Sequence, residues 1–540
     1  MLGARMPTLA ETIDAFLAYT FRESPTAATF AGYPGHDSEL PDLSAAAHAA
    51  RDAADDEFAA SFAAFDGLGP DEAIDRDLVL SELAGRRIVR DRASWRRLPD
   101  AYLGAGLMGC FSLFLRRPAP EAELAEAAAE RLRGVSTLVD QMTENLDAEL
   151  AAANLLRRGA GQARAGAAYA RDLLPAEVGD GPARATVAEA GAGAAGAYER
   201  AAAWLDDLAT RATGSFAVGE ERYSRLLRDR ELLGFDATGL RALGEAQVTE
   251  LAEEMTAVAE KSFATTDFRA VLDRLAEDRP DDPDAMRAGY ELATAEARAF
   301  LVERELVTFP EGERCDVLPS PVFQRPVLAV ASYFSPPAFG DDLTGIFNVP
   351  YPPEGTTEEQ LAQRLADNNF ATMPTVSVHE VYPGHHWHFT RLQIDAAPLR
   401  RVLTTSYFVE GWALYVERMM LEEGFFTNPG HVLAHLDARL FRAARIVVDT
   451  GLHCFGMPFG EAVDYMRSVA GLTEAVATDE VTRYTAWPTQ AASYLTGSLE
   501  IERIRRRWFD EDRGSLRAFH DRIAGTGGLP IALAERATLG

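Results

Sequence analysis

Apolar residues recur every three or four positions along most of residues 8–310, which is the period of an amphipathic helix. The surrounding positions are rich in Ala, Leu, Glu and Arg, which favour helices, so we predict a succession of packed helices. The Ala/Gly-rich segment 188–203 keeps this spacing and is predicted to be a close-packed helix. Chain reversals are expected at Pro34–Gly35, from Arg117 to Pro120, at 159–168 and from Pro280 to Pro283.

The pattern changes in residues 315–352, where β-branched and aromatic runs alternate with Pro and Gly. Short strands are expected at 327–333 and 345–349, joined by a loop that contains Pro336, Pro337 and Gly340. Helical spacing then resumes and continues nearly to the end of the chain. The sequence therefore predicts a mainly α fold with one small β-sheet just before its most unusual segment.

We expect two lobes that form one integrated unit. A mostly helical lobe would occupy residues 1–310, and a second lobe over 311–540 would contain the small sheet and the histidine-rich segment described below.

Charge and lysine content exclude several classes of function. The 53 basic and 83 acidic residues give a net charge of −30, which repels phosphate backbones and anionic lipid headgroups. We therefore expect no nucleic-acid partner and no membrane partner. Lys261 is the only lysine, and no Gly-rich loop precedes it, so neither a P-loop nor a pyridoxal Schiff base is indicated.

Cysteine usage and the first residues bear on the compartment. Cys110, Cys315 and Cys454 are far apart and have no metal-binding spacing, which is typical of a reducing compartment. Glu11 interrupts the segment where a signal peptide would need an apolar core, and no uncharged apolar run approaches the roughly 18 residues of a membrane helix. We therefore expect a cytoplasmic protein.

Histidines are concentrated in one segment of the second lobe. Four of them, His379, His385, His386 and His388, lie within SVHEVYPGHHWHF. A His-Glu pair on a helix, followed by another His about one turn later, is how a zinc hydrolase places two imidazoles on the metal and a carboxylate beside the water. The usual HExxH spacing is absent, because the fourth residue after His379 is Pro383.

Helix geometry does not by itself complete this site. On a straight helix, at about 100° and 1.5 Å per residue, His385 lies about 120° around from His379, and His386 lies about 10 Å along the axis. Neither could share one ion with His379. Pro383 and Gly384 are expected to bulge or break the helix, which could fold His385 or His386 back toward His379.

Glu410 is the candidate for a third ligand, because it begins a strongly amphipathic segment 31 positions after His379. Two imidazoles and one carboxylate leave the fourth position of a zinc ion open to water, and Glu380 would be the general base. The alternative is a solvated polar face without function. For His431 and His435, which lack an acidic neighbour, we expect ordinary helix packing.

The same segments resemble a known bacterial family, the "domain of unknown function 885" family, which is placed among the gluzincin-type zinc metallopeptidases. Its signature HExxPGHH is similar to residues 379–386, and its EGWALYxE is similar to residues 410–417. The resemblance covers nearly the whole chain. It implies a two-lobed helical peptidase fold with a deep cleft and one zinc ion at its floor.

Site residues follow from this resemblance. His379, His385 and Glu410 would be the zinc ligands and Glu380 the catalytic base. The family pattern favours His385 over His386, which would then face the cleft and contact the substrate or the groups around the ligands.

Residues later in the chain are candidates for transition-state and substrate contacts. Related helical zinc peptidases use a late His and Tyr to hold the oxyanion, a role that His453 and Tyr484 could take, although both could equally be buried core residues. Arg483 could bind a substrate carboxylate or pair with Glu480. Asn348 could hydrogen-bond a substrate backbone laid along the sheet edge or sit in a turn.

The leading hypothesis is a zinc-dependent hydrolase acting on a peptide or a small amide-containing substrate. Two alternatives stay open: an amidohydrolase of a small-molecule conjugate, and a non-catalytic peptide-binding protein on a peptidase scaffold. The sequence leaves the substrate, the cleaved end and the oligomeric state undetermined.

Overall fold

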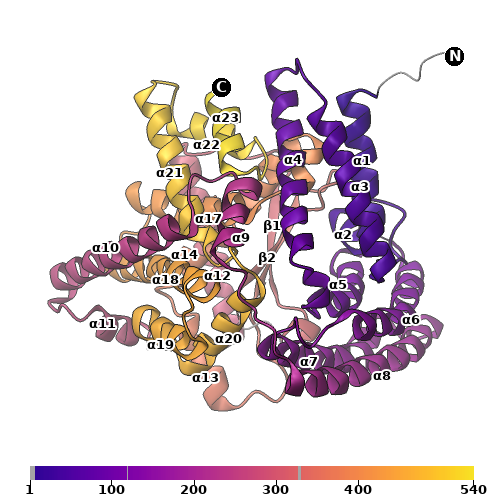
Figure 1. Cartoon of the computed structure of the whole chain (residues 1–540). Helices are drawn as coiled ribbons and strands as arrows, with labels where there is room; N and C mark the ends of the chain where they lie inside the picture. Colours follow the sequence, from indigo (N-terminus) through magenta and orange to yellow (C-terminus); the bar gives the residue numbers. More distant parts are fainter. Residues whose placement is uncertain (1–6, 118, 326–329) are drawn as a thin grey trace. The chain divides into compact units, whose positions relative to one another are not determined.

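The computed structural model describes residues 7–117, 119–325 and 330–540. The chain is mainly helical with one small three-stranded sheet, as the sequence predicted (Figure 1). It divides into two compact units, Met1–Val218 with Pro337–Gly340, and Gly219–Pro336 with Asp341–Gly540.

The first unit is entirely helical over its described residues. Its helices are α1 (Leu9–Glu23), α2 (Pro25–Ala31), α3 (Ala45–Ala63), α4 (Pro70–Asp91), α5 (Asp100–Arg116), α6 (Glu121–Asn145), α7 (Ala153–Ala168) and α8 (Pro182–Arg211). Short 3-10 or π turns lie at η1 (Ser94–Arg96), η2 (Tyr169–Leu173) and η3 (Leu174–Glu177).

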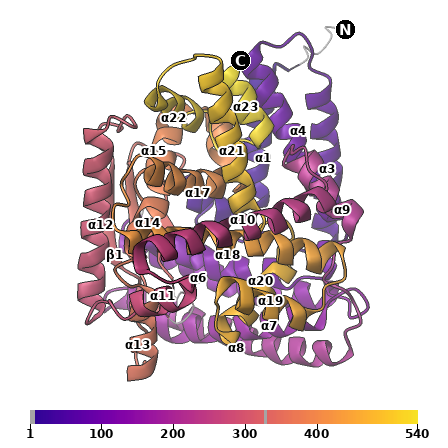
Figure 2. The same cartoon turned by 90° about the vertical axis from the view of Figure 1, so that its left-hand side faces the viewer.

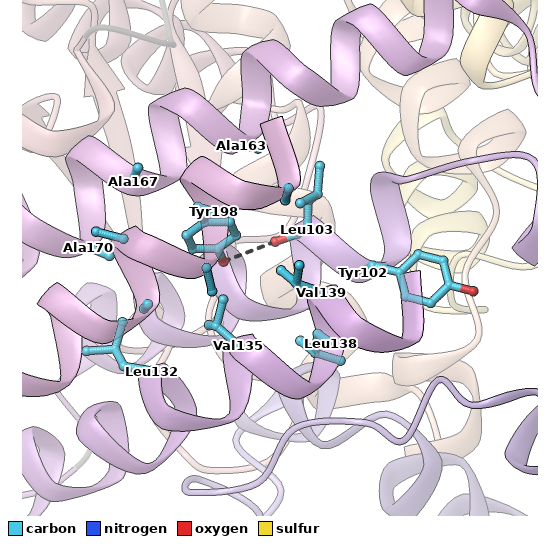
Figure 3. Close-up of a cluster of buried hydrophobic side chains, with 14 of the residues drawn as sticks. Tyr102, Leu103, Leu132, Val135, Leu138, Val139, Ala163, Ala167, Ala170 and Tyr198 are labelled. Atoms are coloured by element: carbon cyan, nitrogen blue, oxygen red, sulfur yellow. Dashed lines mark hydrogen bonds between the residues drawn. The ribbon is translucent and has the colours of Figure 1, made fainter. Parts of the chain in front are cut away.

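The core of this unit is formed by α5, α6, α7 and α8, which Figure 3 shows in close-up. The Tyr198 hydroxyl in α8 lies 3.5 Å from the Leu103 carbonyl oxygen in α5. The segment 188–203 lies inside α8 and packs closely, as predicted. The predicted reversal at 159–168 is wrong, because this segment is helical. Glycine is needed at position 159 for close packing, since a Cβ there would lie 2.4 Å from Pro99.

The second unit contains all three strands and all of the predicted site residues. Its helices are α9 (Glu220–Arg225), α10 (Ala237–Phe263), α11 (Phe268–Leu275), α12 (Pro283–Glu303), α13 (Glu358–Asp367), α14 (Met373–Glu380), α15 (His385–Asp395), α16 (Pro398–Val402), α17 (Ser406–Glu422), α18 (Pro429–Cys454), α19 (Phe459–Ala470), α20 (Glu474–Ala486), α21 (Ser493–Asp510), α22 (Leu516–Ala524) and α23 (Ile531–Leu539). Short turns lie at η4 (Leu226–Arg230) and η5 (Val322–Gln324).

Packing within this unit explains where the chain divides. Helix α10 packs along α18, and α12 packs on α14 (Figure 2). We expected the first lobe to end at residue 310, whereas the main segment of the first compact unit ends at Val218. Amphipathic helices both precede and follow Val218, so helical periodicity carries no signal that α9 to α12 pack with the C-terminal half of the chain.

The sheet consists of β1 (Arg314–Pro319), β2 (Ser332–Phe334) and β3 (Thr344–Val349). Its order is β1-β3-β2, with β1 parallel and β2 antiparallel to the central β3. The strand predicted at 345–349 is confirmed as β3. Of the strand predicted at 327–333, residues 327–329 lie outside the described residues, and β2 begins only at Ser332.

No single described helix is both long and apolar enough to cross a membrane. One pair bent by 98°, Pro70–Arg96 with Asp100–Leu115, meets the criterion by length and composition alone.

Candidate metal centre

The histidine-rich segment is a broken helix. Helix α14 ends at Glu380, and α15 begins at His385 after four non-helical residues in which the Tyr382–Pro383 peptide bond is cis. Backbone hydrogen bonds hold the break: Trp387 N–H donates to the Val381 carbonyl at 3.2 Å. The predicted distortion is thus present, and it places His379 at the end of one helix and His385 at the start of the next.

Gly384 fits the break because it has no side chain. A Cβ built on Gly384 would lie 1.9 Å from the His379 carbonyl oxygen and 2.3 Å from that of Val378. Because both neighbours are backbone atoms, no rotamer change could relieve the contact. Close approach of the two helix ends therefore requires glycine at this position.

We predict that Gly384→Ala separates the ends of α14 and α15, destabilising the protein by about 3 kcal/mol through overpacking and lowering its metal affinity. Thermal unfolding of the zinc-free protein and zinc competition with a chelator measure the two effects. Gly460→Ala is the matched control, since a Cβ there meets nothing within 4 Å and Gly460 lies in helix α19. Equal behaviour of the two variants would contradict the expected crowding at Gly384.

Helix α17 supplies the third group of the site. Its start is capped by Thr405, whose side chain accepts from Phe408 N–H at 3.2 Å, so Glu410 lies in the second turn. One residue later, Gly411 approaches α21 so closely that a Cβ would lie 2.6 Å from Gly497 backbone atoms. Trp412 Nε1 donates to the Pro383 carbonyl at 2.9 Å, which fastens α17 to the break.

Three side chains converge at this point. Glu410 Oε2 lies 3.8 Å from His379 Nε2 and 3.4 Å from His385 Nε2, and one atom from each residue lies within 4.8 Å of the others. Ligand atoms bound at about 2.0–2.1 Å from a tetrahedral zinc lie about 3.3 Å apart. The set of two imidazole nitrogens and one carboxylate oxygen is therefore of the right chemistry and nearly the right size for zinc.

Glu417 orients the first of these imidazoles. Glu417 is buried and lies two turns after Glu410 on α17. Its Oε1 lies 2.7 Å from His379 Nδ1. Hydrogen bonds from His379 and His435 outweigh burial and lower the pKa of Glu417 to about 2, so it is an ionised acceptor. The proton consequently belongs on His379 Nδ1, which leaves Nε2 to face Glu410.

We predict that Glu417→Gln weakens zinc binding by roughly 10- to 100-fold, because an amide is a poorer acceptor for the ligand's N–H. Competition with a chromophoric chelator measures the dissociation constant. Glu422→Gln is the control on the same helix, since Glu422 pairs with Arg505 at 2.7 Å instead. A dissociation constant for Glu417→Gln within twofold of wild type would show that Glu417 does not support the site.

The electrostatics of the site favour a bound cation. Burial lowers the pKa of His379, but the nearby Glu410 carboxylate and the hydrogen bond to Glu417 outweigh burial and raise it to about 10. Burial raises the pKa of Glu410, but the nearby imidazoles of His379 and His385 more than reverse that effect, so the pKa is lowered. Carboxylates thus surround the imidazoles, and a metal would replace the proton that they attract.

Glu380 is the last residue of α14 and is partly exposed. Burial raises its pKa, and the repulsion from Glu410 acts in the same direction, while His379 and His385 oppose it. A carboxylate with a raised pKa accepts a proton more readily than an ordinary one, which suits a general base.

His386 lies in a separate network. Its side chain is buried, with Nε2 at 2.9 Å from Glu313 Oε2 and Nδ1 at 3.0 Å from the Tyr333 hydroxyl. The Tyr382 hydroxyl donates to the same Glu313 oxygen at 2.7 Å. His386 therefore anchors the break to β2 and to Glu313, and the structure brings His385, not His386, to His379.

His453, Tyr484 and Arg483 belong to an internal network. The Tyr484 hydroxyl donates to Glu480 Oε2 at 2.6 Å and accepts from Arg445 Nε at 3.0 Å. His453 Nε2 lies 2.9 Å from the Tyr484 carbonyl oxygen, and Arg483 bonds Glu480 at 3.0 Å. His453 and Tyr484 are buried, so their polar atoms stabilise α18 against α20.

Asn348 lies in the central strand of the sheet, where its backbone pairs with Leu318 on one side and Ser332 on the other. Its side chain is buried as well. The structure therefore does not place Asn348 at a sheet edge, where we expected it to meet a substrate.

Sequence reasoning assigned no role to Glu417 or Glu313, although each contacts a histidine of the cluster. The seven-residue interval from Glu410 to Glu417 was a signal, since residues two turns apart share a helix face. No comparable signal marked Glu313, which precedes β1 and lies far from His386 in sequence.

Residues 25–537 match a family described as "Bacterial protein of unknown function (DUF885)". No functionally curated protein shows significant sequence similarity to the chain. Two solved structures share its fold. One is a "putative lipoprotein of unknown function" from Shewanella oneidensis, with 21% identity, TM-score 0.81 and coverage of 99% of this chain and 100% of that one. The other is a "putative lipoprotein" from Colwellia psychrerythraea, with 19% identity, TM-score 0.85 and 99% coverage of both chains.

The expected cytoplasmic location is contradicted by these structures, because both are described as putative lipoproteins. The expectation depended on the number of cysteines and on a few residues near the start of the sequence. Neither is a property of the fold that this chain shares with those proteins.

Proposed function

The chain belongs to the bacterial family of unknown function DUF885, and we propose that it is a zinc-dependent hydrolase of peptide or amide bonds. The observation that carries the proposal is the convergence of His379, His385 and Glu410, with one atom from each within 4.8 Å of the others. Exposed acidic groups gather by chance on many proteins, but this group is largely buried and has its own supporting carboxylate, Glu417.

His379, His385 and Glu410 would hold one zinc ion. A zinc ion there would lower the pKa of water toward about 7 and polarise an amide carbonyl. Gly384 allows the ends of α14 and α15 to approach each other, and Trp412 holds α17 against the break between them, so that the three groups can meet. Glu417 fixes the tautomer of His379.

Glu380 would act as the general base. Its carboxylate would accept the proton of the attacking water and pass it to the leaving nitrogen, a transfer that typically contributes 10²- to 10⁴-fold. Its position at the end of α14, next to His379 and partly exposed, supports this role.

The substrate would be a peptide or a small amide-containing molecule, and the two compact units would correspond to the two lobes of a metallopeptidase. With a net charge of −30, the chain would have neither nucleic acid nor an anionic surface as its substrate.

Metal analysis combined with a hydrolysis assay tests the proposal. Protein treated with chelator and then resupplied with zinc should contain one equivalent of the metal and cleave members of a peptide library, whereas the chelated protein should not. Zinc without peptide cleavage would favour an amidohydrolase of a small conjugate. Failure to bind zinc would contradict the proposal and would favour a non-catalytic peptide-binding protein.

A further inference from the structure

Helices α17, α18 and α21 meet in a common register beside the candidate metal centre. On α18, His435 Nδ1 lies 3.3 Å from Glu417 Oε2. One turn later, Arg439 Nη1 lies 3.5 Å from the Leu414 carbonyl oxygen of α17 and 3.1 Å from Ser498 Oγ of α21. Helices α17 and α18 therefore run antiparallel to each other.

The next turn of the three helices brings together Arg442, Glu410 and Tyr494. Arg442 is three residues after Arg439, Glu410 is four before Leu414, and Tyr494 is four before Ser498, so each lies one turn further in the same direction. The Arg442 guanidinium carbon lies 5.9 Å from the centre of the Tyr494 ring. Glu410 contributes to raising the pKa of the Tyr494 phenol, next to the larger effect of burial, which agrees with this register.

Arg442 differs from the other arginines around it in its lack of an ion-pair partner. Arg439, Arg445 and Arg418 each have a carboxylate within 3 Å, namely Glu502, Glu480 and Glu254. Within the described residues, no carboxylate lies within 4.0 Å of the Arg442 guanidinium. Its Nη1 donates to the Ala438 carbonyl at 3.1 Å, and its Nε is buried without a partner.

Nearby carboxylates do not neutralise Arg442 directly. Burial raises the pKa of Asp437 and of Glu380, and the charge of Arg442 opposes that rise at both. Arg442 also adds to the lowering of the pKa of Glu417. Asp437, however, pairs with Arg269 at 2.6 Å and Glu417 with His379 at 2.7 Å, and Glu380 is not within ion-pair distance of Arg442. An unpaired cation beside a site that attracts metal raises the cost of binding a second cation there. The position of Arg442 beside the metal centre is therefore better explained if an anionic group of the substrate pairs with it.

Solvent reaches this level of the helices. The Glu410 side chain is 22% exposed, and Arg442 and Tyr494 are partly exposed. A ligand held by Arg442 could therefore extend to the three converging side chains of the metal centre.

We propose that Arg442, whose guanidinium lies near the rings of Phe441 and Tyr494, binds the free terminal carboxylate of the substrate. The fork of the guanidinium matches a carboxylate, and its position level with Glu410 places the scissile amide close to that terminus. The proposal rests on the proposed hydrolase function and names its substrate class: peptides or N-acylated amino acids with a free carboxylate, cleaved at the carboxyl end.

Kinetics on matched substrates test the assignment. The zinc-loaded protein is given N-blocked peptides that end either in a free carboxylate or in an amide. Wild type should prefer the acid at least tenfold in kcat/KM. In Arg442→Gln that preference should disappear through a rise in KM for the acid alone, and Arg442→Lys, which keeps the charge but not the fork, should retain part of it. Arg418→Gln, on α17 and paired with Glu254, should keep the full preference.

Binding to the chelator-treated protein separates this proposal from the proposed function. Calorimetry compares N-acetyl-phenylalanine with N-acetyl-phenylalanine amide. Tighter binding of the acid that is lost in Arg442→Gln supports the carboxylate site, even if no variant hydrolyses peptide and the hydrolase assignment fails. Equal use or binding of acid and amide by wild type would overturn it, as would an equal fall in kcat on both substrates in Arg442→Gln.

Discussion

The Glu380→Gln variant is expected to keep one equivalent of zinc and to hydrolyse peptide at least about a thousandfold more slowly than wild type. The amide is nearly the same size as the carboxylate but cannot take a proton from water. Glu380 is not among the three converging residues, so its replacement should leave metal binding intact. Steady-state kinetics of the zinc-loaded variant, with zinc content measured on the same sample, check both parts.

Glu359→Gln is the control for this experiment, because it makes the same chemical change at an exposed position in the first turn of α13. Its turnover should match that of wild type. Turnover by Glu380→Gln within a few fold of wild type would remove Glu380 from the mechanism, and loss of zinc would make it a ligand instead of a base.

Glu410→Ala is expected to lose both zinc and activity. Only His379 and His385 would remain to hold the ion, so zinc affinity should fall by more than the roughly 10- to 100-fold that follows loss of an outer partner such as Glu417. Zinc content after dialysis and competition with a chelator measure this loss. His379→Ala should behave in the same way.

Glu422→Ala serves as the control on the same helix. Glu422 lies 12 residues after Glu410 and pairs with Arg505, so this variant should retain its zinc. A full equivalent of zinc in dialysed Glu410→Ala would show that Glu410 is not a ligand, and the site would need a different third group.

The sequence by itself determined the helical class and the place of the break in the histidine-rich segment. Helical periodicity reports which face of a segment is apolar, and that property is local. Pro383 and Gly384 act on the backbone within one turn, so their effect could be predicted without knowing what packs around them. The grouping of His379 and Glu410 also followed from sequence, but through long motifs and not through any distance that the sequence contains.

Helix geometry left open which histidine faces His379, the family resemblance favoured His385, and the tertiary structure shows His385 there. His385 and His386 are neighbours in sequence, and the choice depends on the dihedral angles of the break and on Glu313 and Tyr333, which hold His386 from other elements. The division after Val218 was decided in the same way, since periodicity is identical on both sides of it.

The surroundings of the site were likewise invisible in sequence. Whether Tyr484 or Tyr494 lies near Glu410, and whether an arginine has a carboxylate partner, depend on the register of helices that are far apart in the chain. Composition and spacing identify the groups that can do chemistry. Close packing, such as the contact of Gly411 with Gly497, sets which of those groups meet, because helix approach is fixed by side-chain volume across the interface and not by either helix alone.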